Sequence, residues 1–189
     1  MDERIKLVGI ETLSKAWGTL TRATLDYRRT DGTRHTQLRE VYDHGNAAAI
    51  ILFDPARRTV LLTRQFRYPV AHNGDPAWLI EACAGLLDGD DKLTGVMREA
   101  LEETGHRPRD VQFLFDAYMS PGSLTERLSL FVGHYDASTK IAEGGGLASE
   151  GEEIELLELG LDDALALIPS GGIIDAKTIM LLHWLALNR

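Results

Sequence analysis

The segment that decides the fold is a glutamate-rich stretch, Arg98-Glu99-Ala100-Leu101-Glu102-Glu103-Thr104-Gly105. In an α-helix, residues three and four positions apart share a face, so Glu99, Glu102 and Glu103 crowd together. Like charges at this spacing cost stability unless a cation or a basic residue compensates them. Mg²⁺ with carboxylate and phosphate oxygens is one natural compensation, and Arg98 is placed to hold Glu102. From these residues alone, a solvated acidic helix face is an equally good interpretation.

The sequence around this stretch predicts a helix from Lys92 to Thr104, with Gly105 as its C-cap. The glycine- and aspartate-rich segment Gly85–Asp91 predicts a loop before the helix. The pattern of apolar residues and the positions of turn residues predict the later elements. They are strands at Val111–Ala117, Leu128–Tyr135 and Ile154–Leu159, a flexible glycine-rich loop at Glu143–Gly151, and helices at Asp162–Ile168 and Asp175–Leu187.

The residues before Gly85 predict two groups of strands. A small antiparallel sheet is expected from Trp17–Tyr27 and Arg34–Asp43, with Asp31-Gly32 at the turn. The main sheet is expected to begin with the buried strands Ala47–Phe53 and Thr59–Phe66, followed by an irregular stretch from Tyr68 to Pro76. We therefore expect an N-terminal β-sheet region at residues 1–45 and a main domain at residues 46–189.

Composition limits the classes of protein that fit. The chain has 189 residues with 44% hydrophobic content, enough for one good core. Its formal charge of -9 disfavours nucleic acid as a partner, although an acidic protein can bind a phosphate substrate through a divalent cation. The only cysteine, Cys83, follows an apolar stretch and is expected to be a buried structural thiol. No leader or membrane-length apolar run is visible, so we expect a cytoplasmic protein without a membrane partner.

Residues 85–105 resemble the Nudix box, in which a glycine, an acid and an Arg-Glu helix form a metal-binding loop, helix and loop. Here Gly85 opens the motif, Asp91 is the first acid and Gly105 closes the helix. Two departures are visible: Asp91 stands where the family usually has glutamate, and the spacer before Arg98 is one residue short. The register of the three helix glutamates is intact, but the role of Asp91 is open.

Further segments are similar to the nucleoside-diphosphate-sugar branch of the Nudix family. The tripeptide Cys83-Ala84-Gly85 is most similar to members that cleave GDP-mannose, whereas ADP-ribose enzymes commonly carry proline in place of Cys83. The resemblance implies a mixed α/β (α+β) fold: a Nudix α/β/α sandwich with a mixed sheet plus a small N-terminal antiparallel sheet. The other similar segments are Arg39–Tyr42, Arg64–Arg67, Glu81–Gly85, Tyr118–Gly122 and Gly144–Gly146.

The resemblance also implies a Mg²⁺ site, with Mn²⁺ as the alternative metal. Its ligands would be Glu99, Glu103 and the backbone carbonyl of Ala84, with Glu102 in support. A mobile loop outside the box usually supplies the general base and a further ligand. The candidates are Glu150, Glu152 and Glu153, of which Glu152 best matches the start of the family's strand. For any one of them, a merely solvated loop residue is the alternative interpretation.

Substrate contacts follow from the same resemblance. Arg67 is expected on the diphosphate, where its fork of donors suits phosphate oxygens. Trp17 is expected against the nucleobase, although a packed aromatic is equally consistent. Lys177 is expected near the sugar, with a solvated lysine as the equal alternative. The remaining predicted contacts are Leu38, Arg39 and Glu40, which would reach the partner's site in a homodimer, Glu126 on the sugar side, and Ala84, Gly85, Leu86 and Glu103.

The function implied is Mg²⁺-dependent hydrolysis of the pyrophosphate bond of a nucleoside diphosphate sugar. GDP-mannose, giving GMP and mannose 1-phosphate, is the expected substrate; ADP-ribose is the alternative, because Leu38 replaces an expected lysine. Two other classes stay open: a non-catalytic nucleotide-binding Nudix module, and a dimeric structural protein with an acidic calcium site. The intact glutamates argue against the first, and the lack of EF-hand spacing argues against the second.

Overall fold

The computed structural model describes residues 2–188, with the side chain of Glu150 excepted, and the chain divides into two compact units. The first unit contains the N-terminal segment up to Asn46 together with Tyr118–Arg127. The second contains Ala47–Ala117 and the chain from Leu128 onward. The later segment joins the first unit because the Tyr42 N–H donates to the Ser123 carbonyl at 2.8 Å. The expected division after residue 45 did not assign this segment to the N-terminal region.

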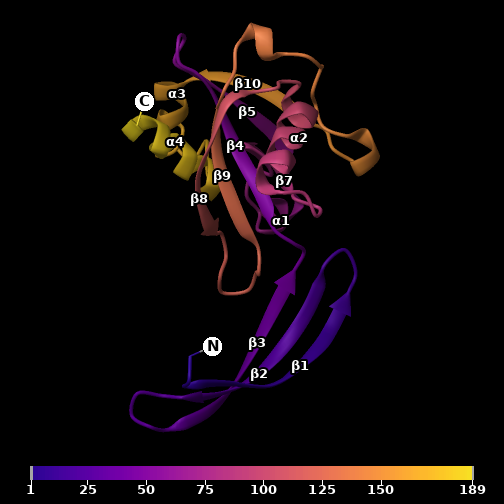
Figure 1. The fold of residues 1–189 in the computed structure, drawn as a ribbon, viewed down its shortest axis with the longest axis vertical. Helices are drawn as coiled ribbons and strands as arrows, with labels where there is room; N and C mark the ends of the chain where they lie inside the picture. The colour runs from indigo at the N-terminus through magenta and orange to yellow at the C-terminus, as the bar shows by residue number, and fades with distance from the viewer. Residues whose placement is uncertain (1, 189) are drawn as a thin grey trace. The chain divides into compact units, whose positions relative to one another are not determined.

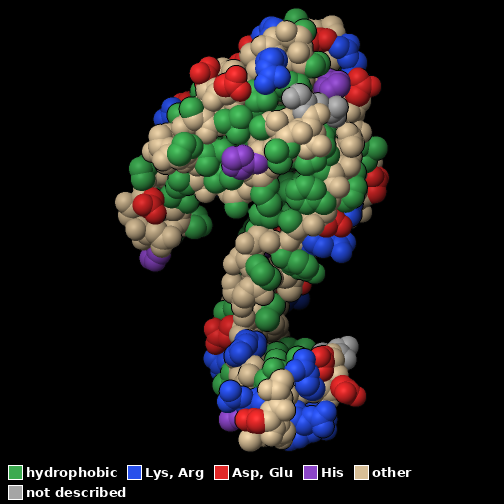
Figure 2. All heavy atoms as spheres, turned by 90° about the vertical axis from the view of Figure 1, so that its left-hand side faces the viewer, with side chains coloured by type: hydrophobic (Ala, Val, Ile, Leu, Met, Phe, Trp, Pro, Cys, Tyr) green, Lys and Arg blue, Asp and Glu red, His purple; other side chains and the backbone are tan. Residues whose placement is uncertain are grey.

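The first unit is built on a three-stranded antiparallel sheet in the order β1-β2-β3 (Figure 1). Its strands are β1 (Ile5–Lys15), β2 (Thr19–Arg28) and β3 (Arg34–Asp43). The β2–β3 turn forms at Asp31-Gly32 as expected, with Gly32 at a φ of 85° that favours glycine. Figure 2 shows many Lys and Arg side chains gathered at one end of this unit. The predicted N-terminal sheet is present, with β1 as an additional strand.

The second unit contains a mixed sheet in the order β10-β5-β4-β9-β8, with β6 beside β5 and β7 beside β4. Strand β4 is central and buried along its whole length. It pairs in parallel with β9, whereas β5 and β7 run antiparallel to it. The strands are β4 (Ala47–Asp54), β5 (Thr59–Phe66), β6 (Trp78–Glu81), β7 (Cys83–Leu86), β8 (Arg109–Tyr118), β9 (Arg127–His134) and β10 (Glu155–Gly160).

Helices cover both faces of this sheet (Figure 1). Ala48, Ile50 and Leu52 of β4 share one buried cluster with Val96 and Ala100 of helix α2 (Lys92–Thr104). Because side chains alternate along a strand, the intervening residues of β4 face the other side, where α3 (Leu161–Ala166) and α4 (Ala176–Asn188) lie. The arrangement is the expected α/β/α sandwich. No helix within residues 2–188 is long and apolar enough to span a membrane.

Short elements depart from the sequence prediction. Helix α1 (Tyr68–His72), with Pro69 in its first turn, occupies part of the stretch expected to be irregular. Gly85 and Leu86 belong to strand β7 and not to the predicted loop, because they pair with the N-terminal half of β4. This pairing partner is distant in sequence and therefore leaves no local signal. Two 3₁₀ turns complete the chain, η1 (Ala137–Thr139) and η2 (Ala148–Glu150).

Both ends of helix α2 are capped by residues next to it in sequence: Asp91 at the start and Gly105 at the end. The Asp91 carboxylate accepts hydrogen bonds from the N–H groups of Leu93 and Thr94 at 3.0 and 3.1 Å. At the other end, Gly105 adopts a φ of 72° and its N–H donates to the Leu101 carbonyl. The helix spans the predicted residues, and in this structure Asp91 is its N-cap.

We predict that Asp91→Ala lowers the free energy of unfolding by about 1 kcal/mol, because two N–H groups of the first turn lose their acceptor. Asp91→Asn keeps an N-capping oxygen while removing the charge, so it should retain most of the stability. Urea unfolding of the two variants beside the wild type measures the difference. Equal losses in both would show that the charge of Asp91, and not its capping oxygen, is what matters.

Candidate active site

Two glutamates of helix α2 are buried against strand β7. Glu99 is 8% exposed and Glu103 only 1% exposed, which is unusual for carboxylates. The Ala84 N–H of β7 donates to Glu103 Oε2 at 3.2 Å. A Cβ on Gly85 would collide with the carboxyl group of Glu99, so only glycine lets the helix approach this closely. The structure thus brings together the four predicted positions Ala84, Gly85, Glu99 and Glu103.

Burial leaves this carboxylate pair short of compensating charge. It raises the pKa of Glu99 to about 7, partly opposed by Arg98 and reinforced by Glu102 and Glu152. Burial also raises the pKa of Glu103 to about 7, opposed by a hydrogen bond with Cys83 and reinforced by Glu99 and Glu152. Two adjacent acids that both resist ionisation mark a place where a cation would be stabilised.

Arg98 organises the acidic face of the helix. Its Nη1 donates to Glu99 Oε1 at 2.8 Å and to Glu102 Oε2 at 3.3 Å, as the sequence predicted for Glu102. Its Nη2 donates to the Leu86 carbonyl at 3.0 Å and so ties the helix to the end of β7. A single guanidinium therefore orients two carboxylates, while Glu103 receives no bond from it.

The glycine-rich segment Gly144–Gly146 is attached to the C-terminal end of α2. The N–H groups of Gly145 and Gly146 donate to the carbonyls of Glu103 and Glu102 at 2.8 and 3.1 Å. A Cβ on Gly144 would lie 2.6 Å from the Thr104 backbone, and its φ is 78°. In this part of the loop the glycines allow close backbone contact with the end of α2, while the flexibility of Glu143–Gly151 stays a prediction.

Glu152 follows this anchored segment. Its Oε2 accepts the Leu147 N–H at 2.9 Å, within its own loop, while its charge acts on both Glu99 and Glu103. Among the side chains that the structure describes, no three acidic, histidine or cysteine groups converge as a ready-made metal centre. Two buried carboxylates beside the backbone of Ala84 nevertheless form an oxygen donor set that suits a hard divalent cation completed by other ligands. The residues fit a metal of that kind.

A second charged network lies at the end of β6 and contains two predicted substrate residues. Arg67 donates through Nε and Nη2 to the two oxygens of Glu81, both at 2.9 Å. Lys177 Nζ donates to Glu81 Oε2 at 2.6 Å and to Asp175 Oδ1 at 3.0 Å. Lys177 is 12% exposed at its side chain, so the interpretation as a solvated lysine is wrong.

Glu81 holds this network as an anion. Burial alone would raise its pKa, but Arg67 and Lys177 together hold the pKa below its usual value. Burial would likewise lower the pKa of Lys177, yet Asp175 and Glu81 raise it. The sequence assigned no role to Glu81. Its only local signal is a glutamate that ends the largely apolar strand Trp78–Glu81.

The remaining predicted contact residues lie in the first unit. Trp17 is 73% exposed and stacks on His44 with ring centroids 5.0 Å apart, so it is not a buried aromatic. Leu38 is exposed on β3, and the neighbouring Arg39 donates to Gln37 Oε1 at 2.8 Å. Two acids complete this set: Glu40, which accepts from Arg22, and Glu126, half-buried before β9.

Comparison with known proteins identifies the family. The Nudix domain model matches residues 43–181, and the chain therefore belongs to the Nudix family. A second model, described as the N-terminal domain of the GDP-mannose pyrophosphatase NudK, matches residues 4–42. The family and the mixed α/β fold predicted from the sequence are thereby confirmed.

Individual relatives agree with both matches. The chain is 47% identical to a GDP-mannose pyrophosphatase of Pectobacterium atrosepticum over 97% of its own length and 94% of the relative. It is 46% identical to a GDP-mannose pyrophosphatase of Yersinia pestis over 97% of its length and 92% of the relative. A crystal structure titled ADP compounds hydrolase shares the fold, with a TM-score of 0.75, 18% identity and coverage of 98% and 94% of the two chains.

We predict that, with divalent metal chelated, the wild type loses more free energy of unfolding than Glu103→Gln as the pH rises from about 4.5 to about 7. A carboxyl with a raised pKa in the folded state contributes stability below its unfolded pKa and loses it as the pH passes the folded value. Urea unfolding in EDTA across this range measures the effect. The control, Glu40→Gln on exposed β3, should follow the wild type, and a Glu103→Gln profile parallel to the wild type would contradict the prediction.

Proposed function

We propose that the protein hydrolyses the pyrophosphate bond of a nucleoside diphosphate sugar in a Mg²⁺-dependent reaction, with GDP-mannose as the preferred substrate. The observation that carries this proposal is the buried pair Glu99 and Glu103 facing Ala84 and Gly85 of β7. The names of the two relatives, both GDP-mannose pyrophosphatases, support the same reaction class. ADP-ribose is the second candidate, since the exposed Leu38 replaces an expected lysine.

Glu99, Glu103 and the Ala84 carbonyl would hold the metal, with Glu102 in support. Nudix hydrolases generally use divalent cations, and Mg²⁺, or Mn²⁺ in its place, suits these oxygen donors. When bound, the ion would neutralise phosphoryl oxygens. Arg98 keeps Glu99 and Glu102 oriented at 2.8 and 3.3 Å.

Arg67 would bind the diphosphate through the part of its guanidinium that remains open. Its Nε and Nη2 are engaged by Glu81, whereas Nη1 makes no hydrogen bond within residues 2–188. Glu81 thus occupies the Nε and Nη2 donors and holds the guanidinium in place, so that Nη1 would meet a phosphate oxygen at little further entropic cost. The buried Lys177 supports the same carboxylate and lies beside Arg67 for a contact on the sugar side.

Glu152 would act as the general base and as a further metal ligand. Its influence on the pKa values of Glu99 and Glu103 supports its nearness to the reacting centre. To reach an attacking water in the substrate complex, the Glu152 carboxylate would give up its hydrogen bond from the Leu147 N–H. The glycines at 144–146 would hold the loop at its base while the segment around η2 moves.

We further propose a cytoplasmic homodimer that needs neither nucleic acid nor membrane. Strand β1 is an edge of its sheet and exposes Val8 by 62% and Ile10 by 64%. An exposed apolar edge strand is suited to pairing with a second copy. Trp17, Leu38, Arg39, Glu40 and Glu126 would contribute to nucleobase, sugar and partner contacts across this assembly.

A coupled phosphatase assay tests the reaction and its substrate. Phosphate release is measured with GDP-mannose and with ADP-ribose, each in the presence and absence of Mg²⁺. GDP-mannose should give the higher kcat/KM, and activity should require the metal. Glu103→Gln should lower kcat by about a hundredfold or more, on the order of 3 kcal/mol. Retention of more than half of the wild-type turnover in this variant would refute the metal assignment, and faster ADP-ribose cleavage would refute the substrate.

Glu152→Gln should lower kcat strongly while leaving KM for the nucleotide sugar nearly unchanged, because a general base acts mainly in the transition state. Glu153→Gln is the matched control, since Glu153 is exposed next to it in sequence. Glu150→Gln should also have a small effect, although the Glu150 side chain lies outside the described residues. Steady-state kinetics decide the matter: equal losses at Glu152 and Glu153 would remove the single-base assignment.

The homodimer should be disrupted by Ile10→Glu, which places a charge on the exposed apolar edge. Light scattering at micromolar concentration should show a dimer for the wild type and a monomer for this variant. Arg29→Glu at the exposed end of the β2–β3 turn is the charge control and should remain dimeric. A wild-type monomer with full activity would overturn the proposal.

A further inference from the structure

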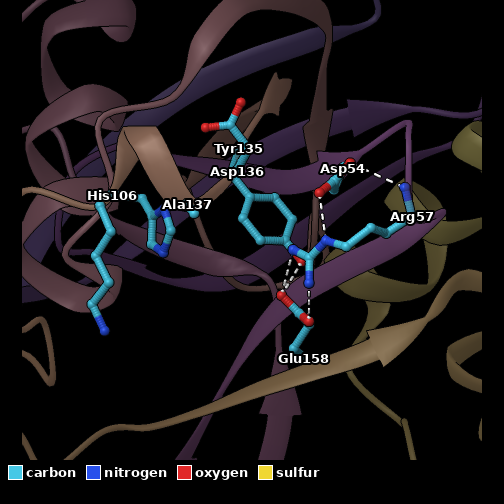
Figure 3. A pocket seen from close by; sticks show the side chains of 8 residues that line it. Asp54, Arg57, His106, Tyr135, Asp136, Ala137 and Glu158 are labelled. Atoms are coloured by element: carbon cyan, nitrogen blue, oxygen red, sulfur yellow. Dashed lines mark hydrogen bonds and ion pairs between the residues drawn. The ribbon is translucent and has the colours of Figure 1, made fainter.

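The second unit contains a cavity of about 590 Å³ away from the buried carboxylate pair. Figure 3 shows the side chains that line it. The cavity lies beside the C-terminal ends of β4, α2 and β9. Asp54 lies five residues beyond Ala49, the partner of Ala84, which corresponds to roughly 16 Å along the strand. The cavity is lined by Asp54, Arg57, His106, Tyr135, Asp136, Ala137, Lys140 and Glu158.

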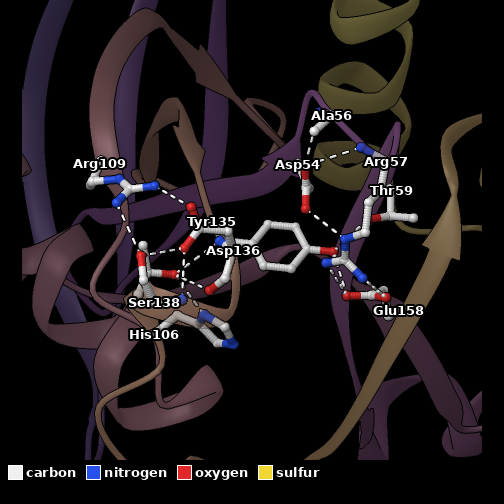
Figure 4. A network of polar contacts seen from close by, with 11 residues as sticks. Asp54, Ala56, Arg57, Thr59, His106, Arg109, Tyr135, Asp136, Ser138 and Glu158 are labelled. Carbon is white, nitrogen blue, oxygen red and sulfur yellow. Dashed lines mark hydrogen bonds and ion pairs between the residues drawn. The ribbon is translucent and has the colours of Figure 1, made fainter.

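The carboxylates of this cavity already have partners (Figure 4). Arg57 donates to Asp54 Oδ2 at 2.6 Å and to both oxygens of Glu158 at 2.5 and 2.8 Å. The Tyr135 hydroxyl donates to Glu158 at 2.9 Å, and Arg109 pairs with Asp136. The acidic groups and the guanidinium of Arg57 are therefore used within the protein and do not select a ligand.

Two polar groups of the lining, the Lys140 ammonium and His106 Nε2, have no polar partner among the described side chains. The Lys140 ammonium forms no ion pair with any side chain that the structure describes, and its charge acts on His106. His106 Nδ1 lies 2.9 Å from the Thr139 hydroxyl, which itself donates to the Asp136 carbonyl at 2.8 Å. With that hydroxyl donating to Asp136, we assign the imidazole proton to Nδ1 and the acceptor role to Nε2. No hydrogen bond satisfies Nε2 within the described residues.

The remaining lining is apolar and flat. The ring of Tyr135 meets the ring of His106 edge to face, with centroids 5.4 Å apart, and Ala137 adds a methyl group. Both rings belong to buried residues, so they form a rigid wall. A volume of this size, with an apolar lining and a few directed polar groups, is typical of a small-molecule site.

We propose that this cavity binds a small molecule with a flat nitrogen-containing ring and an anionic group, the chemistry of a nucleoside monophosphate. The anionic group pairs with Lys140, and a ring N–H donates to His106 Nε2. The ring lies against Tyr135 and Ala137. The site does not depend on the proposed hydrolysis, since none of its lining residues belongs to the metal or diphosphate set.

A ligand here would contact the anchor of the loop that carries Glu152. His106 and Lys140 form an antiparallel bridge, and the next N–H groups, of Ile141 and Ala142, donate to the Gly105 carbonyl at 2.9 and 3.1 Å. The same segment continues into the glycines bound to the end of α2. Occupancy of the cavity therefore bears on how firmly this loop is held at its base.

The test is a titration of the metal-free full chain with GMP, followed by backbone amide chemical shifts. The amides of His106, Ala137 and Lys140 should shift and saturate. Lys140→Ala should weaken this binding about tenfold through loss of a charge-assisted contact. Ala137→Leu should weaken it by filling the cavity from an exposed position, whereas Lys6→Ala, with the same charge loss on β1, should leave it unchanged.

Inorganic phosphate carries only the anionic group and guanosine carries only the nitrogen-containing ring with its sugar, so each should bind more weakly than GMP. Shifts confined to the amides near Ala84 and Glu103 would place GMP at the carboxylate pair and overturn the proposal. Absence of any shift at His106, Ala137 and Lys140 up to millimolar GMP would do the same, as would unchanged affinity in both cavity variants.

Discussion

The burial of two carboxylates between helix α2 and strand β7 is the constraint on which the rest of this structure depends. Glu99 and Glu103 approach the sheet only because Gly85 has no side chain and because the Ala84 N–H meets Glu103. The cost of burying like charges is visible in the raised pKa values of both groups. The helix must therefore be held firmly, and Asp91, Arg98 and Gly105 do so at its start, middle and end.

Glu81 is a second buried anion, and its charge is compensated where that of Glu103 is not. Glu81 is as inaccessible as Glu103, but Arg67 and Lys177 neutralise it, and its pKa falls. The unit thus contains one acidic pair whose only cationic partner among the described residues, Arg98, contacts Glu99 and not Glu103, and one acid, Glu81, that is paired with two basic side chains. The first arrangement suits a divalent metal, and the second positions a guanidinium for an anionic substrate. Both are required if a pyrophosphate is to be held between a metal and a basic residue.

The end of α2 connects these groups to the rest of the unit. The carbonyls of Glu102 and Glu103 are bound by glycine N–H groups of the loop that leads to Glu152, and the Gly105 carbonyl is bound by the segment beside the second cavity. These bonds satisfy the unpaired carbonyls that every helix leaves at its C-terminus. They also attach the loop of a candidate base and the segment beside a candidate ligand site to one helix end.

The sequence by itself determined the elements whose signals are local. Helix α2 was predicted from residue 92 to residue 104 because its periodicity and its C-cap glycine are local signals in consecutive residues. The long strands β4 and β5 and the Asp31-Gly32 turn were predicted for the same reason. Only the tertiary structure decided that Gly85 lies in a strand and that Glu81 meets Lys177 across 96 residues of chain. Such contacts depend on which distant segments pack together, and packing leaves no periodic pattern in the residues that it joins.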